Sequence, residues 1–391
     1  MKKFMFSLMA VAAMAACSKG PQDFTDPNLA PEESGAPEAV LLSTNVKASV
    51  VAKSQGGVDA WNGAQHLHIL GIRRQSSANP DYTNQEAVLI DNVTAVSPVE
   101  GQGSNSIGVF KPGTEESFYY EGNYTYDFFG YYIDDLNIII RKEAKGVYVP
   151  IEITGGQDVM LAKANTVEDL AKSKEAGDFT GDENFDHRYA YSAYAARRGV
   201  HPSLNFEHQL VRFRFYIESG SDFEEGGNDA LVVKSLSVTS KYRAELCVAG
   251  TERGLANIVD ETKDLALCSL DSETKELVDL VPYLVHDKDA ELEEDANLLG
   301  ESLMVFPGEQ EYKINLVLNQ FGNDNPLALN LKFSDVKEGM QNQTAFEAGY
   351  SYKVYIKVVG LEDVELTAEL EEWKDGGRVE IDSDDAPEVI E

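Results

Sequence analysis

Residues 211–217 read Val-Arg-Phe-Arg-Phe-Tyr-Ile, and residues 352–358 read Tyr-Lys-Val-Tyr-Ile-Lys-Val. In both segments every second side chain is apolar, and residues 364–370 repeat the pattern with Glu365, Thr367 and Glu369 between the apolar ones. A period of two turns one set of side chains toward a core and the other toward water, as in the strands of antiparallel sheets. These segments therefore predict an all-β fold.

The rest of the chain supports this interpretation. Residues 312–318 and 327–333 also alternate, and the segment Gly-Asn-Asp-Asn-Pro at 322–326 predicts a loop between them. Helical patterns are confined to residues 166–176 and 272–280. Because strands are not regularly followed by helices, a parallel α/β sheet is not expected and antiparallel β-sandwiches are predicted.

The N-terminus has the features of an export signal. Lys2 and Lys3 precede a 13-residue apolar run, residues 4–16, which ends in Met-Ala-Ala before Cys17. This run is shorter than the ~20 residues that a membrane-spanning helix needs. A cysteine after two small residues fits a lipobox, which predicts lipidation of Cys17; the alternative is an ordinary signal peptide with an incidental cysteine. No later segment is apolar enough to cross a membrane.

Composition and length predict the domain organisation. Residues 18–37 contain prolines and acids but few aliphatic residues, which predicts a flexible tether. The remaining chain is long enough for two domains, which we expect at residues 38–200 and 201–391.

Charge excludes one class of partner. The chain carries 67 acidic and 33 basic residues, for a formal net charge of −34. Nucleic-acid binding needs a clustered basic face, whereas lysine and arginine are here mostly isolated between apolar residues. The acidity predicts a solvated surface and says nothing of the fold.

Two cysteines remain after Cys17. Cys247 and Cys268 are 21 residues apart, each in a short apolar segment. Disulfides persist in exported proteins, so a Cys247–Cys268 bridge is one interpretation and two buried free thiols are the other. Neither cysteine has the spacing or the histidine neighbour of a metal or redox site.

Motifs that carry catalysis were not found in the sequence. There is no GxSxG, P-loop or GxGxxG motif, and the EF-hand-like start at Asp182 fails because His187 occupies the glycine position. His66 and His68 would share a strand face, but no third ligand stands nearby in sequence. We therefore predict no metal, no cofactor and no enzyme activity.

Aromatic residues are concentrated at residues 118–132, where Phe-Tyr-Tyr is followed by Tyr-Thr-Tyr-Asp-Phe-Phe-Gly-Tyr-Tyr. Such rings can form a platform for sugars, because they offer flat apolar faces with polar edges. Aromatic residues are also enriched in strands, so the competing interpretation is that these rings lie in a sandwich core.

Several segments, taken in order, resemble the fimbrillins, the lipoprotein precursors of type V pili in Gram-negative anaerobes. They are LHILGIR (67–73), YTYDFFGYY (124–132), DVMLAKA (158–164), LNFEHQLVR (204–212), LMVFP (303–307), FEAGYSY (346–352) and EEWKDGG (371–377). In the fourth segment we expect a packed or hydrogen-bonded His208 and not a catalytic one.

The resemblance implies two transthyretin-like β-sandwiches in tandem and a structural subunit of a cell-surface fimbria that supports adhesion. In that family a protease removes the tether and the first strand, and a C-terminal strand of the next subunit fills the vacant position by β-augmentation. The first strand is expected within residues 39–52, Lys47 and Lys53 are the candidate processing sites, and Val379 and Ile381 mark the candidate donor strand.

The resemblance also implies partners and location. The partners would be other fimbrial subunits, the outer-membrane lipid through Cys17, and a host or bacterial surface ligand. No arginine precedes Arg73, so an arginine-specific protease has no cut in the expected place. A non-polymerising anchor or tip protein, or a surface glycan-binding lipoprotein, therefore remain alternatives.

Overall fold

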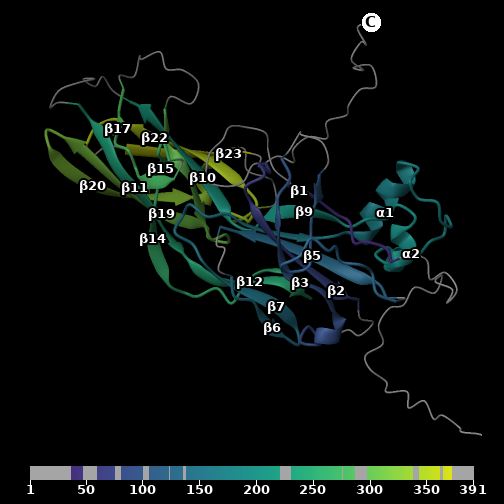
Figure 1. Ribbon diagram of the computed structural model, residues 1–391. Helices are drawn as coiled ribbons and strands as arrows, with labels where there is room; N and C mark the ends of the chain where they lie inside the picture. The colour runs from purple at the N-terminus through teal and green to yellow at the C-terminus, as the bar shows by residue number, and fades with distance from the viewer. Residues whose placement is uncertain are drawn as a thin grey trace, which may run out of the picture.

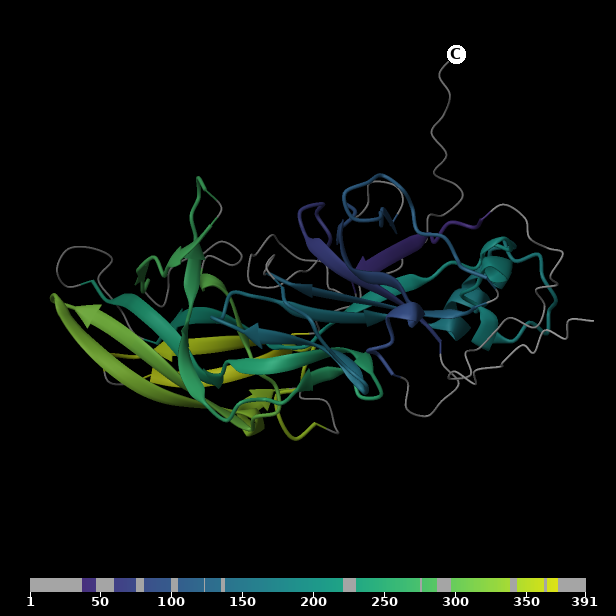
Figure 2. The same cartoon turned by 60° about the horizontal axis from the view of Figure 1, so that its bottom comes forward.

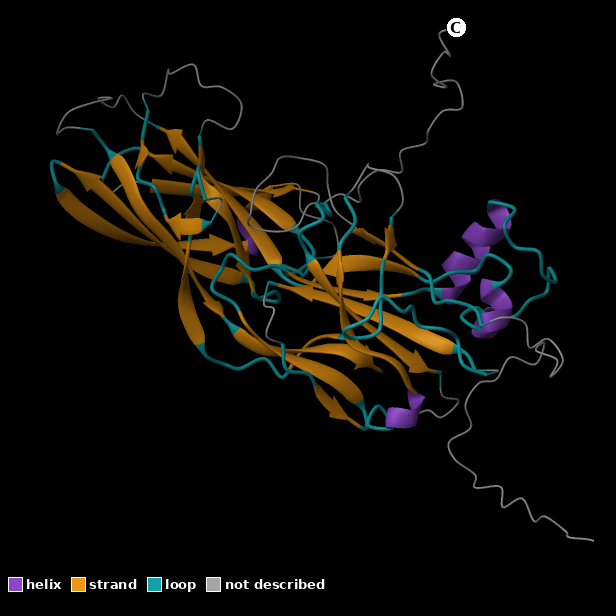
Figure 3. Ribbon diagram, in the orientation of Figure 1, coloured by secondary structure: helices purple, strands orange, loops and turns teal. Residues whose placement is uncertain are grey.

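The computed structural model describes residues 37–46, 60–74, 81–99, 105–122, 124–134, 138–220, 230–274, 276–286, 297–337, 343–361 and 364–371. Strands dominate these residues, which confirms the prediction of an all-β fold (Figure 3). No helix in these ranges is long and apolar enough to cross a membrane.

The first half of the chain contributes the strands β1 (Leu42–Val46), β2 (His66–Arg73), β3 (Val88–Val96), β4 (Ser106–Ile107), β5 (Tyr126–Ile133), β6 (Arg141–Glu143), β7 (Gly146–Glu152), β8 (Val159–Lys163) and β9 (Ser203–His208), and the helices α1 (Thr166–Glu175) and α2 (Ala193–Ala196). The second half contributes β10 (Val211–Ser219), β11 (Val232–Lys241), β12 (Arg243–Gly250), β13 (Gly254–Ala256), β14 (Thr262–Ala266), β15 (Cys268–Leu270), β16 (Leu277–Asp279), β17 (Tyr283–Leu284), β18 (Leu298–Val305), β19 (Glu311–Gln320), β20 (Asn323–Lys332), β21 (Val336–Lys337), β22 (Ser351–Val358) and β23 (Val364–Glu371). Single 3-10 turns lie at Gln85–Ala87, His187–Tyr189 and Phe333–Asp335.

The strands β2, β5 and β8 form the middle layer of the first half. They belong to a sheet of order β3-β2-β5-β8-β9-β1-β4, and a second sheet of order β13-β12-β7-β6 covers one face (Figure 1). The other face is covered by β9, β1 and the two helices. Because both faces of β2 are covered, six consecutive residues of this strand are buried, which explains its nearly continuous apolar sequence.

A glycine allows β9 to fold over the middle layer. A Cβ atom on Gly130 of β5 would lie 2.7 Å from Cζ of Phe206 and 3.2 Å from Cδ1 of Leu204, both in β9. Only a residue without a side chain fits this approach. The strand β9 can therefore pair with β8 through its last two residues and with β1 through its first four.

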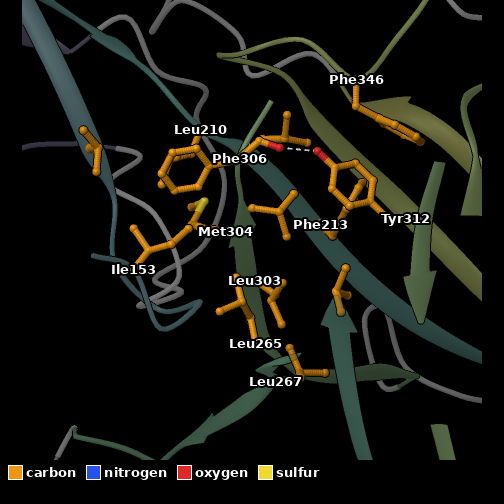
Figure 4. Packing of buried hydrophobic residues seen from close by; sticks show 14 of the residues in the cluster. Ile153, Leu210, Phe213, Leu265, Leu267, Leu303, Met304, Phe306, Tyr312 and Phe346 are labelled. Atoms are coloured by element: carbon orange, nitrogen blue, oxygen red, sulfur yellow. Dashed lines mark hydrogen bonds between the residues drawn. The ribbon is translucent and has the colours of Figure 1, made fainter. Parts of the chain in front are cut away.

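The second half is a β-sandwich. One sheet has the order β18-β10-β22-β23-β21, and the facing sheet has the order β14-β11-β19-β20 (Figure 2). Between them the ring of Phe213 packs edge-on against Tyr312 and Phe346, with centroids 5.3 Å and 5.4 Å away. Tyr312 also donates a hydrogen bond to the carbonyl of Phe306 (Figure 4).

The sheets do not follow the expected boundary between residues 200 and 201. Strand β9 pairs with β8 and β1 of the first half. The hairpin β12–β13 also joins the first half, where β12 pairs with β7 over Arg243–Gly250. Length and composition could not reveal this, because the pairing joins residues about a hundred positions apart in the chain. One apolar cluster runs from β2 and β5 through β7 and β12 into the second sandwich.

Most predicted elements have the expected type. The alternating segments are β10, β19, β20, β22 and β23, and the predicted helix at residues 166–176 is α1. The predicted helix at residues 272–280 is wrong, because its last part is the strand β16. The predicted loop at 322–326 is also wrong, since β20 begins at Asn323.

A two-residue turn replaces that loop. Phe321 and Gly322 have φ angles of 53° and 74°, the backbone form that joins two strands of a tight hairpin. Pro326 lies within β20, where it is tolerated because β20 is the last strand of its sheet and pairs on one side, with β19.

His68 is expected to make the stability of the fold depend on pH. Its side chain is buried in β2 and stacks on Tyr131, with ring centroids 4.8 Å apart. Burial, and then the charge of His66, lowers the pKa of His68 to about 4. The unfolded chain therefore binds one more proton between about pH 6.5 and pH 4, and the free energy of unfolding falls as the pH falls through this window.

The substitution His68→Phe keeps an aromatic ring against Tyr131 and removes the titrating group. Denaturant unfolding at pH 7 and pH 4.5 is expected to show a smaller acid-induced loss in this variant than in the wild type. His187→Gln, at a side chain that is 54% exposed, is the control and should keep the wild-type profile. An equal loss in wild type and His68→Phe would contradict the prediction.

Candidate functional site

The strand β1 is the candidate functional element. It lies between β9 and β4 and runs parallel to β9, with Ser43 opposite Ser203 and Val46 opposite Phe206. On its other side Leu42 faces Ile107 of β4 in an antiparallel pair. Parallel strands need a crossover connection, so β1 is joined to its neighbour β9 only through a long stretch of chain.

Main-chain hydrogen bonds extend this pairing toward the N-terminus. The amide of Val40 donates to the carbonyl of Phe118 at 2.8 Å, and the amide of Tyr120 donates to the carbonyl of Glu38 at 3.0 Å. Residues 38–46 therefore form one extended segment that is held along its length by neighbouring backbone.

Alternate side chains of this segment point into the first half. Val40, Leu42 and Thr44 are 6%, 2% and 0% exposed. Burying two aliphatic side chains contributes roughly 1.5–3 kcal/mol for each. The segment is therefore bound both through its backbone and through three inward side chains.

Trp61 lies beside Thr44, near the C-terminal end of residues 38–46. Its indole Nε1 donates a hydrogen bond to Oγ1 of Thr44 at 3.2 Å. The ring packs edge-on against Phe206 at 5.2 Å and Tyr132 at 6.0 Å. A buried indole N–H needs an acceptor, and in this structure β1 supplies it.

The outward side chains of residues 38–46 are exposed or meet polar neighbours. Leu41 is 56% exposed, and Ser43 and Asn45 are half-buried. Nδ2 of Asn45 donates to Oδ1 of Asn205 at 3.2 Å, and Asn105 donates to Asn45 from the opposite side.

A buried carboxylate fixes the beginning of β9, the main partner of β1. Asp169 of α1 accepts a hydrogen bond from the amide of Ser203 at 2.9 Å and another from the hydroxyl of Tyr191. Burial raises the pKa of Asp169 from its ordinary value. Asn165 caps the helix that carries this carboxylate, because its side chain accepts from the amides of Val167 and Glu168. The hydrogen bond to Asp169 therefore holds the start of β9, which pairs with β1, without a contribution from β1 itself.

Residues 38–46 cover the edge of β9 and the indole of Trp61. If residues 38–46 left, the edge of β9 and an apolar groove ending at Trp61 would face water. An unpaired strand edge beside alternating apolar pockets is the arrangement that binds an added strand.

The other predicted site residues lie outside the described part of the chain. These are Cys17, the processing candidates Lys47 and Lys53, and the donor-strand candidates Val379 and Ile381. Lys47 directly follows Val46, the last residue of β1.

Thr44 and Trp61 were not predicted as site residues from the sequence. A single hydroxyl and a single indole give no signal in the sequence until the fold brings them together.

The candidate disulfide is not formed in the structure. Both thiols are free, with Cys247 in β12 and Cys268 in β15, which belong to different sheets. The Sγ atom of each donates to a nearby carbonyl, Ala249 for the first and Ala266 for the second. Burial raises the pKa of both thiols. Cys247 is buried and Cys268 is half-buried.

The aromatic residues of 118–132 lie mainly in the core. Tyr126, Phe128 and Tyr131 are at most 1% exposed, and Tyr119 is 38% exposed. Burial removes the flat faces that a sugar platform needs, so the core interpretation holds.

His208 is a hydrogen-bonded core residue, as expected. Its Nδ1 lies 2.9 Å from Oδ2 of Asp158, and both side chains are at most 2% exposed. The pair joins the end of β9 to the start of β8 and leaves His208 no access to a substrate from solvent.

Comparisons with known proteins identify the family. The fold is that of an all-β protein with layered sheets. The fimbrillin-like family model matches residues 54–373, which is most of the chain, so the chain belongs to this family. Membership places it among the fimbrial proteins of the cell surface. No curated protein sequence matches the chain.

Solved structures with low sequence identity were also compared. A proposed cell adhesion protein from Bacteroides uniformis is 14% identical with a TM-score of 0.49, and the match covers 86% of this chain and 99% of that one. One from Bacteroides ovatus is 12% identical with a TM-score of 0.45, and the match covers 87% and 99%. The tip fimbrial protein Mfa3 from Porphyromonas gingivalis is 9% identical with a TM-score of 0.35, over 85% and 99%.

Proposed function

We propose that this protein is a structural subunit of a surface fimbria that assembles by strand exchange and supports adhesion. The observation that carries the proposal is the segment 38–46, whose strand β1 pairs with β9 on one side and β4 on the other. Family membership supports the fimbrial role. The part of the chain that matches the family begins at residue 54, beyond this segment.

A protease cut would make the segment removable. Lys47 and Lys53 are the basic residues that follow β1 before the described chain resumes at residue 60. Cleavage after either one separates residues 38–46 from the rest of the mature protein. The cut segment is then held only by its backbone pairing and by three inward side chains. Because these contacts are noncovalent, a competing strand can displace the segment.

Location and partners follow from the same proposal. Cys17 is the proposed lipid attachment in the outer membrane, and residues 18–37 are the tether between lipid and folded protein. The partners are other fimbrial subunits, whose C-terminal strands fill the vacated position, and a surface ligand bound in adhesion. The protein acts by assembly and not as an enzyme.

A second candidate role is that of an anchor or tip subunit which keeps its first strand. The observation that favours it is the absence of arginine before Arg73, because it leaves an arginine-specific protease no cut beside β1. The two roles differ in whether the precursor loses residues 38–46.

The double substitution Lys47→Gln/Lys53→Gln tests processing in the native organism. In the wild type, intact mass of surface protein is expected to show a chain that begins at Ala48 or Ser54, and electron microscopy is expected to show filaments. The double variant should retain residues 38–46 joined to the rest of the chain, with filaments lost. Lys142→Gln, at a lysine paired with Asp91 in the first half, is the matched control and should be processed normally. Uncut wild-type protein without filaments would support the anchor or tip role instead.

A further inference from the structure

A hollow of about 460 Å³ lies between the strand β3 and the hairpin of residues 110–117, in which Phe110 pairs with Ser117. Residues 91–94 of β3 and residues 110–114 of the hairpin line it, and none of them belongs to the segment 38–46. Sites that hold small ligands have volumes of roughly 300–1,000 Å³. The hollow is therefore large enough for a small ligand.

The β3 side of the hollow contains a bulge. Two residues of β3, Asp91 and Asn92, stand opposite one residue of β2. Asn92 has a φ of 50°, a left-handed backbone form that asparagine adopts more readily than most residues. The strand β3 is an end strand of its sheet, where bulges commonly redirect a side chain. The bulge thus gives the hollow a polar side chain from an otherwise regular strand.

The amide group of Asn92 is half used. Its Oδ1 accepts a hydrogen bond of 2.6 Å from the hydroxyl of Tyr131, a buried residue that stacks on His68. This contact fixes the orientation of the amide. Its Nδ2 donates no hydrogen bond to the residues that the structure describes. Two N–H groups of Asn92 can therefore donate to a ligand.

Phe110 supplies an apolar surface on the hairpin side. The residue is 45% exposed, and a Cβ atom on Gly108 would lie 2.7 Å from its Cε2, so the ring lies directly against this glycine. Backbone hydrogen bonds from Lys111 to Glu116 and from Thr114 to Lys111 hold the hairpin. The ring is positioned before a ligand arrives, which lowers the cost of ordering it on binding.

The charges of the lining are paired. Nζ of Lys111 lies 2.6 Å from the carboxylate of Glu116, and Asp91 pairs with Lys142 of β6. An anionic ligand would find the single base of the lining already paired, on a chain whose formal net charge is −34. The hollow therefore suits a neutral ligand.

We propose that this hollow binds a neutral sugar residue of a surface glycan. A pyranose has an apolar C–H face that stacks on an aromatic ring, and hydroxyl groups that donate and accept hydrogen bonds. Phe110 provides the ring. Nδ2 of Asn92 provides a donor, and the hydroxyl of the exposed Thr94 provides a donor and an acceptor. The inference rests on the adhesion in the proposed function, to which it adds a ligand class and a site, and it is independent of strand exchange.

Saturation-transfer NMR of the purified protein tests the ligand class. The probes are the methyl glycosides of glucose, galactose, mannose and N-acetylglucosamine, with N-acetylneuraminic acid as the anionic comparison. At least one neutral probe is expected to bind in the millimolar range, and the anionic sugar is expected to bind more weakly or not at all. Binding of the anionic sugar alone, or of no probe, would overturn the proposal.

Two substitutions test the site. Phe110→Ala is expected to raise the Kd of the bound probe roughly tenfold, because the stacking surface is lost. Phe321→Ala, which removes an exposed ring from another hairpin, is the matched control and should bind as the wild type does.

Asn92→Asp tests the amide donor. The aspartate keeps an acceptor for Tyr131 and tolerates the positive φ, but it cannot donate through Nδ2. The Kd is expected to rise roughly tenfold, with a melting temperature close to that of the wild type. Wild-type affinity in both Phe110→Ala and Asn92→Asp would show that the sugar binds elsewhere and would overturn the proposal.

Electron microscopy of the same variants in the native organism separates this inference from the proposed function. Phe110→Ala and Asn92→Asp should form filaments as the wild type does, because neither residue lies in the segment 38–46. Wild-type filaments without sugar binding would refute the sugar site alone. Sugar binding at the hollow without filaments would support the site and refute the structural role in a fimbria.

Discussion

A chain that lacks residues 379–391 is expected to fold, to reach the cell surface and to form no filaments. The deletion removes the proposed donor strand and begins beyond β23, which ends at Glu371. The receiving position at β1 is unchanged, but no subunit can fill the position of the next. Electron microscopy of surface preparations is the measurement, together with a thermal melt of the purified protein.

A shorter deletion is the control for this experiment. Removal of residues 385–391 keeps Val379, Ile381 and Ser383 and should leave filaments comparable to those of the wild type. Filaments of normal length after the longer deletion would refute a donor role for the tail, and a lower melting temperature would show that the tail also supports the subunit's own fold.

Phe213→Ala is expected to lower the free energy of unfolding by about 3–5 kcal/mol. Phe213 is 0% exposed, and its ring contacts Tyr312, Phe346 and Tyr352. Its strand, β10, lies between β18 and β22, so the cavity would open at the centre of a sheet where neighbours on both sides resist collapse. Urea unfolding followed by intrinsic fluorescence gives the value.

Phe321→Ala is the matched control. The same ring is removed from the hairpin turn between β19 and β20, where Phe321 is 58% exposed, and stability should change by no more than roughly 0.5 kcal/mol. Equal losses in the two variants would show that the second sandwich is not packed around Phe213.

Sequence reasoning was successful where the local pattern and the burial agree. The strands β19 and β22 bury alternate residues over most of their length, and the alternation is visible in the sequence. It failed at residues 272–280, where residues 272–274 form a turn and Leu277–Asp279 form the short strand β16. Pairing of β16 with β15 decides that structure, and local propensity does not reveal such pairing.

The candidate site was predicted only in part. The position of the first strand near residues 39–52 followed from the family resemblance, and β1 lies within this range. The hydrogen bond between Trp61 and Thr44 could not be predicted, because it depends on a parallel pairing of residues 43–46 with β9, far along the chain at residues 203–206. A parallel pair between such distant segments leaves no signal in the alternation of either strand.

The hairpin β12–β13 imposes an order on the biogenesis of the protein. Its residues cover the same layer as β7, over the apolar face formed by β2, β5 and β8. During synthesis and export the first 242 residues emerge without this cover, since β12 begins at Arg243. Until β12 has formed, the apolar face of β2, β5 and β8 therefore lacks part of its cover. We expect the two halves to complete their cores together and not one after the other.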